Sequence, residues 1–100
     1  MKLVWAPLAE TRAREAVDYI ARERPAVAAT WLEELLERTA ALSRFPRRGR
    51  EVPEIARPPY REIQHAPYRV IYRVDETQVV ILTVRHSRRA WDSTEVPDGA

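Results

Sequence analysis

The sequence predicts an α+β fold: an N-terminal strand, an antiparallel helix hairpin, and then three antiparallel strands that form a curved sheet. Three observations predict it. Apolar residues recur at helical spacing through the first half of the chain. The second half holds three segments rich in Tyr, Val and Ile, separated by short turns. At 100 residues the chain can bury one core but not two, so both halves should share one domain.

The first half predicts a strand followed by two helices. Lys2–Trp5 is a short strand candidate. A helix should run from about Pro7 to Arg22, because proline fits the first helical position, where its missing N–H costs nothing. Pro25 opens a second helix, and the short connection makes the two helices antiparallel. The second helix carries an apolar line with the 3-4 alternation suited to packing on another helix: Ala28, Leu32, Leu35, Thr39 and Leu42.

Two further apolar residues of the second helix lie off this line. Trp31 and Leu36 widen the apolar face beyond what one partner helix covers. They either pack on a sheet or form a surface for a partner protein, and we favour the sheet.

The second half predicts a basic turn, a loop and three strands. Gly49 punctuates the basic turn, and the segment Glu51–Pro59 has three prolines and no periodicity, which indicates a loop. Strands are expected at Tyr60–Gln64, Tyr68–Asp75 and Gln78–His86. The turns between them are short, so consecutive strands should pair as antiparallel neighbours.

Charge is distributed unevenly along the chain. The net charge of +2 combines −1 in residues 1–43, +6 in residues 44–91 and −3 in residues 92–100. Sixteen of the seventeen basic residues are arginine, whose guanidinium suits carboxylate and phosphate contacts. The domain should span residues 1–91, and the acidic tail 92–100 is expected to fray.

The composition excludes several kinds of site. The chain has no cysteine, and its two histidines are 21 positions apart without ligand-like spacing, so we expect no metal and no cofactor. The longest run without a charge is eight residues, far shorter than a membrane span. We therefore expect a cytoplasmic protein without membrane association or a targeting segment.

Several short pieces occur in a characteristic order: Trp5 before the Ala-rich first helix, the turn Phe45–Arg50, the segments Tyr60–Ile63 and Pro67–Val74, and the closing Val84–Arg89. In this order they resemble the RelE/ParE toxins of bacterial type II toxin–antitoxin systems, over about residues 3–91. The resemblance implies a curved antiparallel sheet backed by the helix hairpin.

The family has two activities. RelE-type members are ribosome-dependent mRNA endonucleases, whereas ParE-type members poison DNA gyrase and have no established hydrolytic site. Ribonucleolytic members tend to carry a lysine-rich strand and a tyrosine near the C-terminus. This chain has Lys2 as its only lysine and no tyrosine after Tyr72. It is therefore more similar to the ParE-type, plasmid-stabilising members.

That similarity implies a gyrase-poisoning toxin, neutralised by a cognate ParD-like antitoxin in a hetero-oligomer. The alternative is a RelE-like endonuclease that acts on the ribosome and its mRNA. A second alternative is a non-toxic binding module on the same fold.

Strand alternation places the candidate site residues. The apolar residues of the two longest strands form sets that should face the helices: Val70, Tyr72, Val74, Val80, Leu82 and Val84. If they do, Arg69, Arg73 and Arg85 project together from the open face, where they could bind a phosphate. Glu62 could pair with Arg69 or Arg73, and His86 has the parity of the core-facing set.

In the ParE-like interpretation the chain has no catalytic residue. The RelE-like alternative would use Arg69 and Arg88 for the phosphate and His86 as acid or base. The antitoxin's C-terminal segment would cover apolar surface beside the hairpin and the sheet, at Trp31, Leu35, Leu36 and Trp91. Trp91 is the strongest candidate anchor, because a tryptophan in a polar tail has little core to join. It could equally be a lid over the sheet edge.

Overall fold

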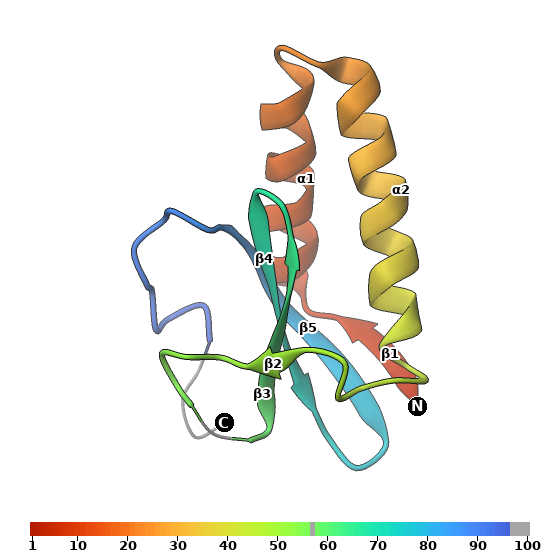
Figure 1. Cartoon of the computed structure of the whole chain (residues 1–100), viewed down its shortest axis with the longest axis vertical. Coiled ribbons are helices and arrows are strands. Elements are labelled where there is room, and N and C mark those ends of the chain that lie inside the picture. Colours follow the sequence, from red (N-terminus) through yellow and green to blue (C-terminus); the bar gives the residue numbers. More distant parts are fainter. Residues whose placement is uncertain (57, 97–100) are drawn as a thin grey trace.

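The computed structural model describes residues 1–56 and 58–96 and confirms the predicted α+β fold. The chain runs through β1 (Lys2–Trp5), α1 (Pro7–Ala21), α2 (Pro25–Ala41), β2 (Arg50–Glu51), β3 (Tyr60–His65), β4 (Tyr68–Val74) and β5 (Gln78–His86). These strands form one sheet in the order β1-β5-β4-β3-β2. β1 is parallel to β5 and the other pairs are antiparallel (Figure 1). The sequence did not predict the two-residue β2, which joins the last residue of the basic turn, Arg50, to the first residue of the predicted loop, Glu51.

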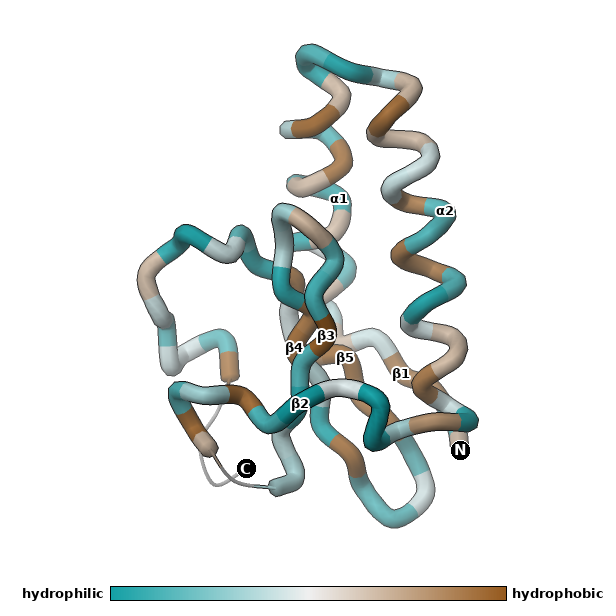
Figure 2. The backbone as a smooth tube through the Cα atoms, viewed as in Figure 1, coloured by the Kyte–Doolittle hydropathy of each residue, from teal (hydrophilic) through white to brown (hydrophobic). Residues whose placement is uncertain are grey.

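The helix hairpin has the limits that its prolines predict. Pro7 and Pro25 occupy the first turn of α1 and α2, where no intrahelical N–H bond is lost. The buried residues of α1 are all alanines, Ala9, Ala13 and Ala16. Their small side chains let α1 pack closely against both α2 and β5. Short hydrophobic stretches alternate with hydrophilic ones along both helices, as amphipathic helices require (Figure 2).

The main core lies between the hairpin and the sheet. Trp31 and Leu35 of α2 pack there against Val70 and Tyr72 of β4 and Val84 of β5. The expectation that Trp31 packs on the sheet is confirmed, whereas the same expectation is wrong for Leu36, which is 52% exposed. The Trp31 ring centroid lies 5.0 Å from that of His65 and 5.3 Å from that of Tyr68, and its indole N–H donates to the Ala66 carbonyl at 3.1 Å.

A second, smaller core covers the opposite face of the sheet. It consists of Val52, Tyr60, Ile71, Val80, Leu82 and Val96, with Trp91 at its border. The loop between β2 and β3 and the segment after β5 therefore cover a face that the sequence predicted to be open. No helix in the described part of the chain is long and apolar enough to cross a membrane.

The sequence predicted that Val80 and Leu82 face the helices, but both face this second core. A bulge in β5 explains the difference. Ile71 pairs with Thr83, while the next residue, Tyr72, pairs with Ile81. Leu82 is thus an extra residue, and it shifts the alternation of the strand. Before the bulge, Val79 and Ile81 face the helices; after it, Val84 does.

The tail expected to fray from residue 92 is folded back in its described part. Glu95 and Val96 are only 5% and 1% exposed. Val96 joins the second core, and arginines from α1, β5 and the following turn hold the Glu95 carboxylate. Spacing in the sequence gives no sign of these distant ion pairs. Residues 97–100 of the predicted tail lie outside the described residues.

Candidate functional site

The candidate site is centred on two arginines on the sheet face away from the helices. Arg69 of β4 and Arg85 of β5 are cross-strand partners, so their side chains leave the sheet side by side. Trp91 lies over both: its ring centroid is 5.5 Å from the Arg69 guanidinium carbon and 5.2 Å from that of Arg85. Two stacked cations fix the indole as a lid over this face.

Two carboxylates compensate the charge of Arg69. Glu54, in the loop before β3, accepts two hydrogen bonds from the terminal nitrogens of Arg69, at 2.9 and 2.7 Å. Glu62 of β3 accepts from Nε at 3.0 Å and from Nη2. The bond from Arg69 lowers the pKa of the Glu54 carboxyl, and the same bond raises the pKa of the guanidinium. The predicted pairing of Glu62 with Arg69 is confirmed.

Glu62 is itself fully buried and fully bonded. Its other carboxylate oxygen, Oε2, accepts from Arg50 Nε at 3.0 Å and Nη2 at 2.9 Å, and from the Gln64 amide at 2.9 Å. Two guanidiniums and an amide therefore occupy the lone pairs of this carboxylate. It is therefore arranged as a structural ion pair, because a general base would need a free lone pair facing a substrate.

Arg85 is also occupied by the protein itself. Its Nη1 donates to Glu95 Oε2 at 3.0 Å, and its Nη2 donates to the Ala90 carbonyl. The other Glu95 oxygen accepts from Arg12 Nε of α1 at 2.7 Å and from Arg89 at 3.4 Å. Burial lowers the pKa of Arg85, against the raising effect of Glu95. The Glu95 carboxylate thus stands where an external anion would otherwise bind.

The three arginines predicted to project together do not form an open phosphate cradle. Arg73, the third of them, donates to Asp75 at 2.9 and 3.1 Å. Each of the three is therefore paired with a carboxylate of the same chain. A phosphate would have to displace these carboxylates to reach the guanidiniums.

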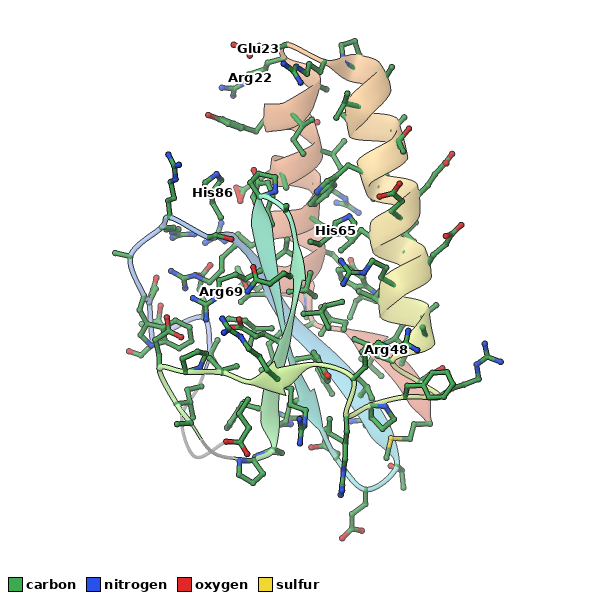
Figure 3. All side chains as sticks on the ribbon, viewed as in Figure 1. Arg22, Glu23, Arg48, His65, Arg69 and His86 are labelled. Carbon is green, nitrogen blue, oxygen red and sulfur yellow. The ribbon has the colours of Figure 1, made fainter. Side chains whose placement is uncertain are left out.

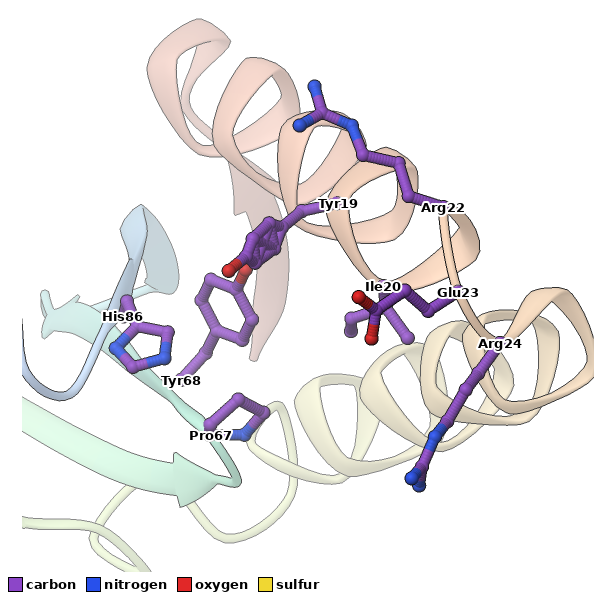
Figure 4. Close-up of a pocket in the computed structure, with 8 residues that line it drawn as sticks. All are labelled: Tyr19, Ile20, Arg22, Glu23, Arg24, Pro67, Tyr68 and His86. Atoms are coloured by element: carbon purple, nitrogen blue, oxygen red, sulfur yellow. The ribbon is translucent and has the colours of Figure 1, made fainter.

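His86 lies on the predicted helix side of the sheet, but it shares that side with Val84 only because the bulge at Leu82 shifts the alternation of β5. Its ring packs edge-on against that of Tyr68, with the ring centroids 5.3 Å apart. Its Nδ1 accepts a hydrogen bond from the Arg88 backbone N–H at 3.1 Å. Both rings line a cleft of about 330 Å³ between the end of α1 and the β3–β4 turn (Figure 4). Tyr19 borders the same space, and Glu23 projects toward it.

The three residues of the nuclease alternative are therefore not all brought together, because Arg69 is separated from His86 and Arg88. Tyr68 and His86 pair across the strands and face the helices, whereas the next pair along, Arg69 and Arg85, faces the other way. The sheet separates the imidazole from the Arg69 guanidinium. Arg88 is exposed beyond the end of β5. Figure 3 shows His86 and Arg69 at separate positions along the sheet.

The four residues predicted to contact a partner have different environments. Trp31 and Leu35 are buried in the chain's own core. Leu36, one position further along α2, is 52% exposed. Trp91 is half-buried over Arg69 and Arg85, so it is a lid over the sheet face at β4 and β5 and not over the sheet edge, as the alternative interpretation expected.

Sequence reasoning missed several residues that organise this face. Glu54 and Glu95 complete the ion pairs, and Arg12 reaches Glu95 across 83 positions of sequence. The available signal was the negative charge of the tail, because an acidic tail beside a basic segment favours ion pairs between them. His65 was also unassigned; it is buried, with Nε2 2.9 Å from the Trp31 carbonyl and Nδ1 3.1 Å from Arg38.

No cluster of histidine, cysteine or acidic residues in residues 1–56 and 58–96 could hold a metal ion. What the geometry defines is a small α+β protein whose basic sheet face is closed by its own carboxylates and one tryptophan.

Residues 3–91 match the family described as the ParE toxin of the type II toxin–antitoxin system parDE, and the chain belongs to that family. Among solved structures, it is similar to a chain of the chromosomal ParDE system from P. aeruginosa. The TM-score is 0.71 at 20% identity, over 86% of this chain and 95% of that one. It is also similar to a chain of the RelBE2 toxin–antitoxin complex from Mycobacterium tuberculosis. There the TM-score is 0.59 at 25% identity, over 85% and 95% of the two chains. No curated protein matches the sequence.

Proposed function

We propose that this ParE-family toxin inhibits growth by poisoning DNA gyrase and has no hydrolytic site of its own. It would act in the cytoplasm, where a cognate antitoxin would neutralise it, and the pair would stabilise the plasmid or chromosomal region that encodes it. The observation that carries the proposal is the ion pairing of the sheet face within a chain of the ParE family.

The pairing argues against RNA cleavage for a chemical reason. Cleavage without metal needs a base for the 2′-hydroxyl, an acid for the leaving oxygen, and cations for the growing charge on phosphorus. Here Arg69 and Arg85 are bound to carboxylates, and His86 lies on the other face of the sheet. The residues that the RelE-like alternative assigned to the phosphate and to acid–base chemistry thus do not meet at one place.

Two parallel assays of the purified chain test the proposal. The first measures supercoiling and trapped DNA cleavage by gyrase; the second measures mRNA cutting on translating ribosomes. We expect loss of supercoiling, accumulation of cleaved DNA and intact mRNA. Cut transcripts with unaffected gyrase would overturn the proposal in favour of the RelE-like alternative. No effect in either assay, with folded protein, would favour the non-toxic binding module.

We also propose that the antitoxin's C-terminal segment covers exposed apolar side chains on α2 and beside the lid. Leu36 of α2 is 52% exposed, and the neighbouring Trp31 and Leu35 would support that contact from beneath. Trp91 is the corresponding candidate on the other face. Both similar structures come from toxin–antitoxin systems, which supports a protein partner.

Leu36→Gln should weaken antitoxin binding about tenfold or more, because it removes the large exposed apolar side chain of the proposed α2 contact. Titration calorimetry with the cognate antitoxin measures this directly. Tyr19→Gln, an equally exposed change on α1, is the control and should leave the affinity unchanged. Equal affinities for wild type and Leu36→Gln would remove α2 from the proposed interface.

A further inference from the structure

The ion pairs of the sheet face leave the basic surplus of the chain concentrated elsewhere. Residues 44–91 carry a net charge of +6. Many of their arginines are paired with carboxylates: Arg50, Arg69, Arg73, Arg85 and Arg89. By contrast, Arg44, Arg47 and Arg48, in the turn after α2, are exposed and form no ion pair within residues 1–56 and 58–96. In Figure 3, Arg48 lies beside the C-terminal end of α2, away from Arg69 and His86.

An exposed aromatic ring stands among these arginines. Phe45 is 51% exposed, and the guanidinium carbons of Arg48 and Arg44 lie 4.8 and 5.9 Å from its ring centroid. Phe45, Pro46, Arg47 and Arg48 line a shallow groove. We refer to residues 44–48 as the basic corner. It presents a flat aromatic surface and cations within one short segment.

The basic corner is held rigidly from beneath. The Gly49 N–H donates to the Tyr72 hydroxyl at 2.9 Å, and that hydroxyl donates to the Pro46 carbonyl at 2.7 Å. Arg61 Nη1 donates to the Gly49 carbonyl at 2.7 Å. A surface whose backbone is already ordered loses little entropy when it binds a partner, so its contacts translate more fully into affinity.

We propose that the basic corner is a binding surface for single-stranded nucleic acid. Its arginines would contact successive phosphates, and Phe45 with its stacked guanidiniums would carry an unpaired base. An acidic peptide would satisfy the charges but has no flat face for the ring. A duplex would also satisfy the charges, but its bases are already stacked. Glu51, the carboxylate next in sequence after the basic corner, forms no ion pair with these arginines in the described part of the chain.

This binding surface goes beyond the proposed function, because it requires neither gyrase nor an antitoxin. The test therefore uses only the full chain and a fluorescently labelled 12-nucleotide oligo-dT, with affinity measured by anisotropy from 50 to 200 mM salt. Its failure would leave the gyrase proposal untouched, and a failed gyrase assay would leave this surface untouched.

The decisive variant replaces Arg44, Arg47 and Arg48 together by glutamine. We expect about a tenfold or greater loss of affinity at 100 mM salt, and a salt slope reduced by about 2, since each single-strand phosphate contact contributes about 0.7. The matched control replaces Arg14, Arg22 and Arg24, which are exposed at α1 and the helix turn, and changes the net charge equally. It should retain wild-type affinity within about twofold.

Equal losses in both triple variants would show a general effect of net charge and overturn the proposal. Absence of binding by the wild-type chain at 50 mM salt would also overturn it. A melting curve for each variant checks that the fold is intact; all six substituted side chains are exposed, so it should be.

Phe45→Leu separates stacking from charge. It keeps an apolar side chain and removes the ring, so oligo-dT affinity should fall about fivefold or more while affinity for a 12-base-pair duplex stays constant. An equal effect of Phe45→Leu on both ligands would overturn the nucleic-acid assignment. A competition experiment gives a second check. The assignment would also be overturned if poly-glutamate displaced oligo-dT at a lower concentration of charges than unlabelled oligo-dT does.

Discussion

Gly49 shows how a single residue fixes the basic corner. A Cβ at this position would meet the Glu62 carbonyl oxygen and would lie 2.6 Å from the Tyr72 hydroxyl, closer than non-bonded atoms approach. The turn thus needs glycine because β3 and β4 pass directly beneath it. The sequence indicated a turn at Gly49, and the structure supplies the physical reason for a glycine there.

Gly49→Ala should destabilise the fold by about 2 kcal/mol, because the new methyl group forces either the turn or the backbone of β3 to move. Denaturant unfolding followed by circular dichroism measures the difference. Arg47→Ala, two positions earlier and exposed, is the control and should change stability by less than about 0.5 kcal/mol. An alanine variant as stable as the wild type would show that the turn can relax without cost.

The lowered pKa of Glu54 makes one contribution to stability depend on pH. A carboxyl with a lowered folded pKa stabilises the fold above its unfolded pKa, about 4.3, and this stabilisation is lost as pH falls through the folded value. Glu54 is one-third exposed, so the contribution should be less than about 1 kcal/mol.

Glu54→Gln should therefore unfold more easily than wild type at pH 7, and the gap between them should close as pH falls below about 4. Urea unfolding at several pH values gives both curves. Glu33→Gln, on the exposed face of α2, is the control whose curve should follow the wild type. A gap that stays constant down to pH 2 would contradict the assignment to the Glu54–Arg69 pair.

At the scale of elements, the segment after β5 is the feature that spacing could not predict. Residues 91–96 cross the sheet face because Trp91 stacks on two arginines, Glu95 bonds Arg85 and Arg12, and Val96 enters the second core. Each contact joins residues that are far apart in sequence or separated by a turn. Local propensity had indicated only a polar, acidic end.

Glu95→Gln should cost about 3 kcal/mol or more, because it leaves the fully buried Arg85 guanidinium without its counter-charge. Hydrogen exchange would then show faster exchange in residues 91–96 as well as a lower melting temperature. The double variant Arg85→Met with Glu95→Leu should recover much of the loss, since it removes both charges. A double variant no more stable than the single one would contradict the account.

The elements themselves were largely predictable, and their faces only in part. Proline positions limited both helices, and the Tyr/Val/Ile segments located β3, β4 and β5 to within a residue. The face assignment held for β4, where alternation is regular. It was wrong for Val80 and Leu82 because the bulge at Leu82 depends on pairing with β4, which no local pattern in β5 reveals. The faces of Arg69 and Glu62 were correct, but their partner Glu54 lies in a loop without periodicity.

For the whole molecule, the fold separates the arginines of the sheet face from those of the basic corner. On the sheet face they are neutralised and serve packing; on the basic corner they are free of carboxylates in the described chain. A net charge of +2 hides this division. Any function that needs cationic contact is therefore expected to use the basic corner first, while the sheet face contributes rigidity.

The separation of His86 from the arginines of the sheet face yields a test of the whole protein's activity in cells. The double variant His86→Gln with Arg88→Gln should inhibit growth as strongly as wild type when expressed without an antitoxin. The reason is that gyrase poisoning requires no acid or base at His86, which the sheet separates from Arg69. The measurements are colony survival, induction of the SOS response and transcript integrity, with the wild-type chain in parallel.

If the double variant kept its melting temperature but lost growth inhibition, and if wild-type expression cut transcripts without DNA damage, His86 would be a catalytic residue. The carboxylates on Arg69 and Arg85 would then have to open during the reaction, because a phosphate can reach those guanidiniums only by replacing Glu54, Glu62 and Glu95.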